Sequence, residues 1–324
     1  MPPDCPPATR PPLANRSVLL SKRILALVAC ALGCLLSPAT AGEAITAQAP
    51  ETVKASSADE AHENTDVASL RAALEEYALA IRDGDARAIL ARTHENVARR
   101  RVDARYWGRP SREWIRPVSR EMLAASVARS TDAERRTGND ADTRPAPEIL
   151  IDDLATRSAS ARLLIGDRFE AVHAVHLNGR WVIADACIGP TATLSEKERD
   201  DAEQAITGLI TDYCQGFYEK DGERVRATCH PILSKRAVER FSEDKPEFLS
   251  RITYEEIEIL GEEFNTYFNY EPGVARMEIE VYDIRDGIAT ARLTGESWFD
   301  YFQFLRVNGA WRIVNIIYES LEEN

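Results

Sequence analysis

The sequence predicts an α+β protein with two tandem domains, and three observations support this prediction. The chain has 324 residues, 44% hydrophobic and 29% charged, which suits two globular domains better than a single core. Two long segments occur twice, in the same order and without internal gaps. In each copy a helical pattern comes first and alternating strands follow, which is typical of helices that cover one face of an antiparallel sheet.

The first repeated segment pairs HENVARRRV, which begins at His94, with HPILSKRAV, which begins at His230. The second pairs HLNGRW (176–181) with RVNGAW (306–311), and these two lie slightly closer together in the chain than the first pair. Because the two spacings differ, a loop between the helices and the sheet differs in length between the copies. We therefore predict one domain at residues 65–190 and a second at residues 191–324.

Each copy begins with a predicted pair of helices. Residues 69–83 carry apolar side chains at helical spacing, with Ser69 as a cap, and residues 205–217 repeat the pattern. A Gly-Asp or Asp-Gly break separates this helix from a second one, which should end near the repeated histidine. Strand-like alternation fills the last third of each copy, with an Asn-Gly hairpin turn in the final stretch.

Residues 1–41 have the pattern of a signal peptide. Lys22 and Arg23 precede the apolar run ILALVACALGCLL, which is too short to span a bilayer comfortably. Ala39 and Ala41 then fit the small-residue cleavage pattern, so we expect cleavage after Ala41.

Cleavage there would export the mature chain, and a bacterial periplasm is the expected compartment. An alternative stays open, in which Cys34 is lipidated and anchors the protein to a membrane. Residues 42–64 are small, polar and rich in Pro, Ala and Glu, so they predict a disordered tether.

The charge distribution excludes one class of partner. The net charge is -13, and residues 191–324 contain 15 basic and 28 acidic side chains. Because phosphate binding needs a basic face, nucleic acid is not an expected partner. The sequence also lacks CxxC, HExxH, GxSxG and Walker-type motifs, so neither a metal site nor a cofactor is predicted.

The order of elements resembles the nuclear transport factor 2-like superfamily, and the second copy resembles the putative lumazine-binding family within it. The resemblance covers roughly residues 195–322. It rests on the Tyr213 helix, the Asp221 turn, HPILSKR (230–236) and FDYFQFLRVNGAWRIVN (299–315). The first copy departs from this pattern, since Glu95 follows its histidine where proline is expected.

The resemblance implies a cone-shaped α+β domain, in which a curved sheet wraps around three helices and a pocket lies between them. The superfamily contains isomerases, dehydratases, polyketide cyclases and binding proteins without catalysis. The fold therefore does not decide the function.

Several polar residues of the second copy are candidates for this pocket. We expect His230 and Tyr213 to face the same cavity from neighbouring helices, where His230 could act as a general base. In the other interpretation His230 simply closes its helix before Pro231. Lys235 and Arg236 are candidates for binding an anionic ligand, or else belong to a solvated helix face.

A second group of candidates lies on one predicted strand. Asp300 follows aromatic residues that include Trp298, which could raise its pKa for proton transfer, although a structural hydrogen bond is the alternative. Trp298 and Tyr301 are candidate contacts for an apolar or aromatic ligand. Because neighbouring strand residues point to opposite faces, Asp300 and Tyr301 cannot both line one pocket without a bulge.

Cys214 and Cys229 are predicted to form a disulfide. Their midpoint falls at the Asp221-Gly222 break, and residues equidistant from the turn of an antiparallel helical hairpin come side by side. An oxidising compartment would allow the bond. The alternative is two buried free thiols, and Cys187 is expected to stay unpaired.

Residues 99–120 contain eight arginines, with Trp107 and Trp114 between them. Such a segment can bind an anion or stack on an aromatic ligand. It can also dock onto the acidic second domain, which is the interpretation we favour.

We expect an exported protein that binds a small apolar or aromatic molecule, or another protein, without catalysis. The alternative is an isomerase or dehydratase that uses the cavity of the second domain, with His230 as the base. Docking of the two domains within one chain is expected, although open sheet faces would also allow a homodimer.

Overall fold

The two sequence copies fold as two β-sheets, each with three helices. The structure, a computed structural model, describes residues 57–106, 109–137, 145–242 and 244–321. The predicted signal peptide with Cys34, the first part of the predicted tether and Trp107 lie outside the described residues. Residues 55–324 form one compact unit.

The first half contains a six-stranded sheet. Its helices are α2 (Ser57–Asp83), α3 (Ala86–Arg92) and α4 (Arg120–Thr137). Its strands are β1 (Thr93–Tyr106), β2 (Arg109–Val118), β3 (Glu148–Leu154), β4 (Ser158–Ile165), β5 (Arg168–Leu177) and β6 (Arg180–Pro190), in the order β2-β1-β6-β5-β4-β3.

The second half contains a five-stranded sheet. Its helices are α5 (Glu196–Glu219), α6 (Gly222–Thr228) and α7 (Tyr254–Phe268). Its strands are β7 (Cys229–Arg236), β10 (Glu278–Arg285), β11 (Ile288–Thr294), β12 (Trp298–Val307) and β13 (Ala310–Ser320), in the order β10-β11-β12-β13-β7, and a small separate sheet joins β8 (Val238–Glu239) to β9 (Phe248–Leu249).

The two sheets have the same topology, which is the arrangement expected for a repeated domain. The order β1-β6-β5-β4-β3 corresponds strand for strand to β7-β13-β12-β11-β10. In both, four strands are antiparallel, and the strand that carries the repeated histidine pairs parallel with the last one. The copies differ after that strand, because β1 continues into a long hairpin with β2 whereas β7 leads to the short β8 and β9. This difference explains the change in spacing between the repeated segments.

Local sequence explains where several helices begin. Asp85 caps α3 by accepting hydrogen bonds from two backbone amides, and Asp221 caps α6 in the same way with one. Ser195 and Thr253 form capping boxes with the glutamates three residues later, at the starts of α5 and α7.

Two predicted boundaries are wrong. Helix α2 begins at Ser57, so part of the predicted tether is helical and Ser69 lies inside a helix rather than at its cap. The second helix of each copy has only seven residues and ends before the histidine, so that His94 and His230 lie on strands β1 and β7. Parallel pairing with β6 and β13 holds these segments extended, and this pairing is a long-range contact that local spacing does not reveal.

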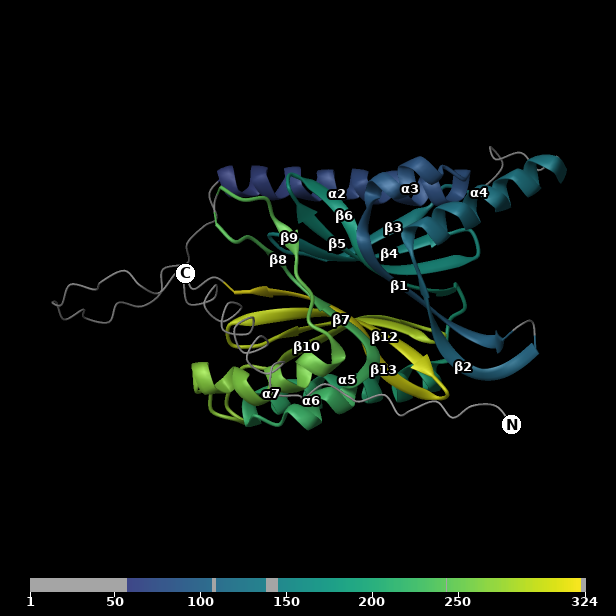
Figure 1. Cartoon of the computed structure of the whole chain (residues 1–324). Coiled ribbons are helices and arrows are strands. Elements are labelled where there is room, and N and C mark those ends of the chain that lie inside the picture. Colours follow the sequence, from purple (N-terminus) through teal and green to yellow (C-terminus); the bar gives the residue numbers. More distant parts are fainter. Residues whose placement is uncertain (1–56, 107–108, 138–144, 243, 322–324) are drawn as a thin grey trace, which may run out of the picture. The chain divides into compact units, whose positions relative to one another are not determined.

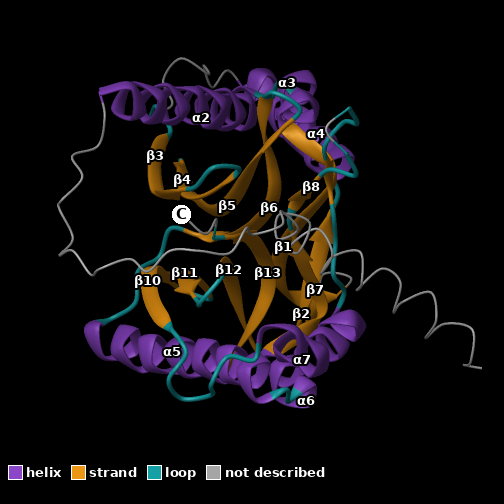
Figure 2. Ribbon diagram, turned by 90° about the vertical axis from the view of Figure 1, so that its left-hand side faces the viewer, coloured by secondary structure: helices purple, strands orange, loops and turns teal. Residues whose placement is uncertain are grey.

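The helices of each half cover the outer face of its sheet, and the inner faces of the two sheets lie against each other (Figures 1 and 2). Each half therefore has a helix–sheet core. We call the contact between the inner faces the sheet–sheet interface. Its buried apolar side chains are Ile115, Phe169, Ala171, Val175, Val182, Ala184, Cys187, Ile288, Leu305, Val314 and Ile317. The predicted α+β fold, with three helices packed on a curved sheet, is confirmed in both halves.

The predicted disulfide between Cys214 and Cys229 is wrong, because both side chains are buried free thiols. The prediction placed both residues on a pair of helices. Instead α6 ends at Thr228, so Cys229 starts β7, and its Sγ lies 3.6 Å from the carbonyl oxygen of Val225. Burial raises the pKa of both thiols to about 12, which keeps them protonated at neutral pH. Cys187 is also a buried free thiol.

Among the described residues, no helix combines the length and the apolar run that crossing a membrane requires.

The contact between α6 and α7 gives a first prediction. A Cβ atom on Gly222 would stand 2.0 Å from the carbonyl oxygen of Glu258, whereas one on Gly208, within α5, would meet nothing within 4 Å. We expect Gly222→Ala to lower the free energy of unfolding by about 3 kcal/mol, because α7 must move away. Gly208→Ala should raise it by up to about 1 kcal/mol. Denaturation in urea measures both changes, and equal effects of the two substitutions would contradict the packing described.

Candidate functional site

The interior of the second half contains a buried polar cluster that joins four of the predicted site residues. Asp300 on β12 lies at its centre and forms an ion pair with the ammonium group of Lys235 on β7. The indole nitrogen of Trp298 donates a hydrogen bond to the other carboxylate oxygen at 3.1 Å. The ammonium nitrogen lies 5.6 Å from the ring centre of Tyr213 on α5 and 4.4 Å from that of Tyr318.

The charges in this cluster depend on one another. Burial lowers the pKa of Lys235, and the neighbouring carboxylate of Asp300 opposes that effect. Burial and the charge of Asp300 raise the pKa of Tyr213 well above its usual value, so its hydroxyl stays protonated. Asp300 is fully buried and both of its oxygens are bonded. The cluster is therefore a satisfied ion pair, which agrees with the structural interpretation of Asp300.

The first half contains the equivalent cluster, built from different residue types. Glu170 takes the place of Asp300, Arg99 the place of Lys235, and Tyr77 the place of Tyr213. Arg99 donates to Glu170 at 2.5 Å, and the Tyr77 hydroxyl donates to its other oxygen at 3.0 Å. Arg168, which stands where the second half has Trp298, also pairs with Glu170.

These charges determine the ionisation of the acid in the first half. Burial opposes ionisation of Glu170, but Arg168 and Arg99 outweigh burial and lower its pKa. The sequence contained the signal for this cluster, since Glu170 and Asp300 are separated by the same spacing as HLNGRW and RVNGAW. The pair looks like a mismatch because the side chains differ in length, although both are acids.

The repeated histidines have a local role in the structure. The imidazole Nδ1 of His230 accepts the backbone N–H of Ile232 at 3.3 Å, and that of His94 accepts the N–H of Asn96 at 3.1 Å. His230 was expected on a helix beside Tyr213, and this is wrong because it occupies the second position of β7. Burial and Arg100 lower its pKa, so the imidazole is neutral at pH 7.

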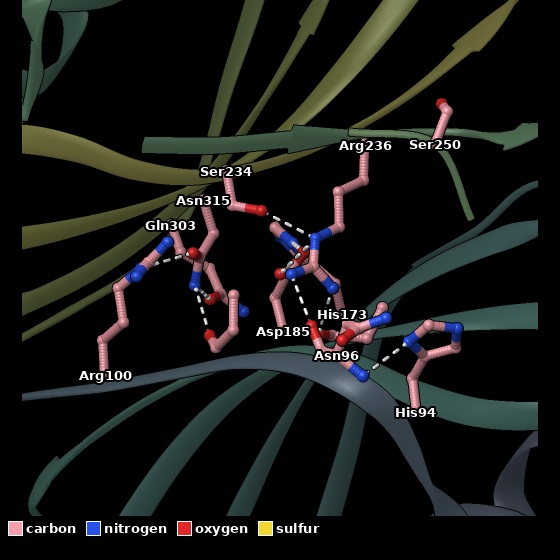
Figure 3. A network of polar contacts seen from close by, with 12 residues as sticks. His94, Asn96, Arg100, His173, Asp185, Ser234, Arg236, Ser250, Gln303 and Asn315 are labelled. Carbon is pink, nitrogen blue, oxygen red and sulfur yellow. Dashed lines mark hydrogen bonds and ion pairs between the residues drawn. The ribbon is translucent and has the colours of Figure 1, made fainter. Parts of the chain in front are cut away.

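The second basic residue of each repeated pair crosses the sheet–sheet interface (Figure 3). Arg100 of the first half donates to the side-chain oxygen of Asn315 at 2.7 Å and to the carbonyl oxygen of Ile232 at 2.5 Å. Arg236 of the second half, predicted as a ligand contact, lies 3.6 Å from a carboxylate oxygen of Asp185.

Arg236 also donates to the carbonyl oxygen of Asn96 at 2.6 Å. Asp185 and Asn315 occupy equivalent positions in the two copies, and so do Asn96 and Ile232. The two arginines therefore make corresponding contacts in opposite directions. An interface between two identical subunits has the same reciprocal character, but here both surfaces belong to one chain.

Further contacts repeat this reciprocity. Arg292 pairs with Asp153 across the interface, and the equivalent Arg162 lies 3.3 Å from Asp283. Tyr301 points to this interface too, where its hydroxyl donates to Asp153 at 2.9 Å. Asp300 and Tyr301 thus occupy opposite faces of the sheet, as strand alternation predicts.

The arginine-rich segment divides among several surfaces. Arg99 is in the interior of its own half and Arg100 crosses to the second half. Arg101 and Arg116 both pair with Asp103 of their own hairpin. Only one of these four arginines therefore docks in the way that we predicted for the segment. No group of three or more potential metal ligands occurs among the described residues.

Residues 201–319 match the family described as "Putative lumazine-binding". The second half is similar to that family, as its sequence predicted. A comparison with curated proteins found no match.

Among solved structures, an NTF2-like protein of unknown function from Shewanella baltica is 19% identical, with a TM-score of 0.33, over 40% of this chain and 100% of its own. Another from Methylobacillus flagellatus is 21% identical, with a TM-score of 0.31, over 41% of this chain and 100% of its own. A ketosteroid isomerase-like protein from Erwinia carotovora is 15% identical, with a TM-score of 0.27, over 37% and 96%.

The reciprocal arginines give a second prediction. Arg100→Met should lower the free energy of unfolding by about 3 kcal/mol, because Asn315 and the carbonyl of Ile232 lose a charged donor in a buried interface. Arg101→Met is the matched control, since the half-exposed side chain of Arg101 pairs with Asp103 of its own hairpin, and it should change stability by about 0.5 kcal/mol or less. Urea unfolding of both variants measures these changes. Equal losses of unfolding free energy in Arg100→Met and Arg101→Met would contradict the role given to Arg100.

The histidines give a third prediction. Burial lowers the pKa of His94 and of His230 in the folded protein, so the unfolded chain takes up protons first as the pH falls below about 6.5. Their contribution should therefore lower stability between pH 7 and pH 5. We expect a His94→Asn, His230→Asn double variant to lose less stability over this range than the parent, as measured by urea unfolding at each pH. Equal losses would mean that the imidazoles protonate freely in the folded state.

Proposed function

We propose that this chain is an exported binding protein without catalytic activity, and that its second half holds a small flat aromatic molecule. The observation that carries the proposal is the pairing of the interior polar groups. Lys235 and Trp298 each bond one carboxylate oxygen of Asp300. The cluster therefore contains charged groups, but its carboxylate is not available as a general acid or base. Export is supported by the sequence pattern of residues 1–41.

The residues of this cluster are also buried, which argues against a catalytic pocket around them. Tyr213, Lys235 and Asp300 are each less than 5% exposed. Two cavities among the described residues, of about 360 and about 310 Å³, are lined by other residues. A catalytic site needs a concave space in which polar groups converge on a substrate.

The aromatic side chains around this cluster suggest the ligand class. Trp298 meets Phe264 of α7 edge-on with ring centres 4.9 Å apart, and Tyr218 in the same way at 5.6 Å. Phe268 and Tyr270 stack at 5.3 Å with nearly parallel rings. Phe264, Phe268 and Tyr270 are only half-buried. We infer that a flat ring inserts among these outer side chains, where stacking is favourable.

The family comparison supports the same class. The matched family is named for lumazine, a flat aromatic heterocycle with several hydrogen-bonding groups. A ring of this kind would stack on the half-buried aromatic side chains. Among the described residues, the sheet–sheet interface does not cover this outer edge of the second half, because the interface lies on the opposite face of the sheet.

Two other candidate functions receive less support. An isomerase or dehydratase with His230 as the base is favoured only by the lowered pKa of His230, which keeps the imidazole neutral. Against it, the Nδ1 of His230 already accepts a backbone amide, and the residue lies on β7 rather than beside Tyr213. Binding of another protein is favoured by the pairing of Asp300, whose two carboxylate oxygens are both bonded inside the chain, since this leaves the outer surface as the functional one.

The proposal predicts binding of lumazine as the probe. Native mass spectrometry of the chain from Gly42, produced in an oxidising compartment, should detect a bound small molecule that is lost on denaturation. Titration with lumazine should quench tryptophan fluorescence, and Phe264→Ala should weaken binding by about tenfold because one stacking partner is lost.

Phe241→Ala is the matched control, since Phe241 is 84% exposed and stacks on Phe248, and it should bind like the parent. Absence of both a copurifying molecule and lumazine binding would refute the proposal. So would equal weakening by the two substitutions, or turnover of the bound molecule.

A further inference from the structure

A cavity of about 360 Å³ opens at one edge of the sheet–sheet interface, away from the aromatic side chains around Trp298. Its apolar lining includes Val102, Ile288 and Leu305, and its charged lining includes Glu113 on β2. Gly287, in the turn between β10 and β11, lies at its edge. The volume lies within the range of sites that bind small molecules.

The reciprocity of the two halves identifies the equivalent position at the other end of the interface. Glu113 accepts the backbone N–H of Asn308 at 2.6 Å, and the Asn308 side chain donates to the Glu113 carbonyl at 3.1 Å. Glu247 accepts the N–H of Asn178 at 2.7 Å, and the Asn178 side chain donates to the Glu247 carbonyl at 3.0 Å. Each glutamate therefore holds the Asn-Gly turn of the opposite half, and the two are structural equivalents.

At the Glu247 end of the interface, basic side chains fill the position that is equivalent to the cavity. Glu247 pairs with Arg157 at 3.3 Å and with Arg240 at 2.8 Å. Arg157 corresponds to Gly287 when the two copies are aligned on their Asn-Gly turns. Among the described residues, no basic side chain forms an ion pair with Glu113. The cavity thus occupies the space where the other end of the interface holds a guanidinium group.

At the cavity, glycine also takes the place of a second charged residue from the Glu247 end of the interface. Glu319 accepts the backbone N–H of Arg157 at 3.0 Å, and its equivalent in the first half is Gly189, which lines the cavity. A Cβ atom on Gly189 would stand 2.8 Å from the Cδ1 of Ile288, so the two elements approach closely. The absence of side chains at Gly189 and Gly287 leaves the space open.

We propose that this cavity binds a small organic cation, an alkylguanidine or alkylamine. Its charged head would lie beside Glu113, as the Arg157 guanidinium lies beside Glu247. Its apolar body would cover Val102, Ile288 and Leu305. This site is separate from the aromatic side chains of the second half and does not depend on the function proposed for them.

Charge around the cavity favours a cation over a neutral molecule. Asp286 adds a second carboxylate to the lining, against the single exposed guanidinium of Arg306. The net charge of the protein is -13, which raises the local concentration of cations near its surface. A guanidinium group can donate two parallel hydrogen bonds to one carboxylate, which gives it an advantage over a neutral head of the same shape.

The test uses n-butylguanidine and its uncharged isostere N-butylurea, each titrated into the chain at low salt and followed by NMR. We expect the guanidine to bind about tenfold or more tighter than the urea. Glu113→Gln should weaken guanidine binding by a similar factor, since glutamine can still accept the Asn308 amide but lacks the charge. Glu247→Gln is the matched control and should bind like the parent, because its position is already occupied by Arg157.

Arg306→Ala supplies an independent variant that leaves Glu113 in place. It should strengthen guanidine binding, because a like charge is removed from the rim. The proposal is overturned if the guanidine does not bind, if the urea binds equally well, or if Glu113→Gln and Glu247→Gln have the same effect. Urea unfolding of each glutamine variant checks that it is folded under the conditions of the titration, so that a difference in binding reflects the site.

Discussion

The packing of two sheets against each other is the constraint on which the rest of this structure depends. A sheet that is covered by helices on one face must still cover the other. Here each half covers the other, and Arg100 and Arg236 cross the interface in equivalent directions. Because both halves belong to one chain, the interface needs no second subunit.

Buried charge explains why a basic pair recurs beside each histidine. The first member, Arg99 or Lys235, points into its own half and neutralises the acid there. The second, Arg100 or Arg236, points to the opposite sheet, since neighbouring strand residues face opposite sides. An unpaired buried cation is costly, so both members have fixed partners. A single dipeptide thus links each interior to the interface.

The two halves differ at two places, the surroundings of the buried acid and one edge of the sheet–sheet interface. The second half has Trp298 and its aromatic neighbours where the first has Arg168, which pairs with Glu170. At the interface edge, Gly287 replaces Arg157 and a cavity appears. Both proposed binding regions are such departures.

The sequence by itself determined the α+β class, and it predicted a repeat with which the matching strand orders of the two sheets are consistent, because both depend on local periodicity and on spacing along the chain. It also predicted the opposite orientation of Asp300 and Tyr301. Only the tertiary structure decided that His230 lies on a strand, that Cys214 and Cys229 are free thiols, and which partner each buried charge has. Parallel pairing of β7 with β13 and packing across the sheet–sheet interface decide these outcomes. Such contacts join residues far apart in the chain, and no local pattern encodes them.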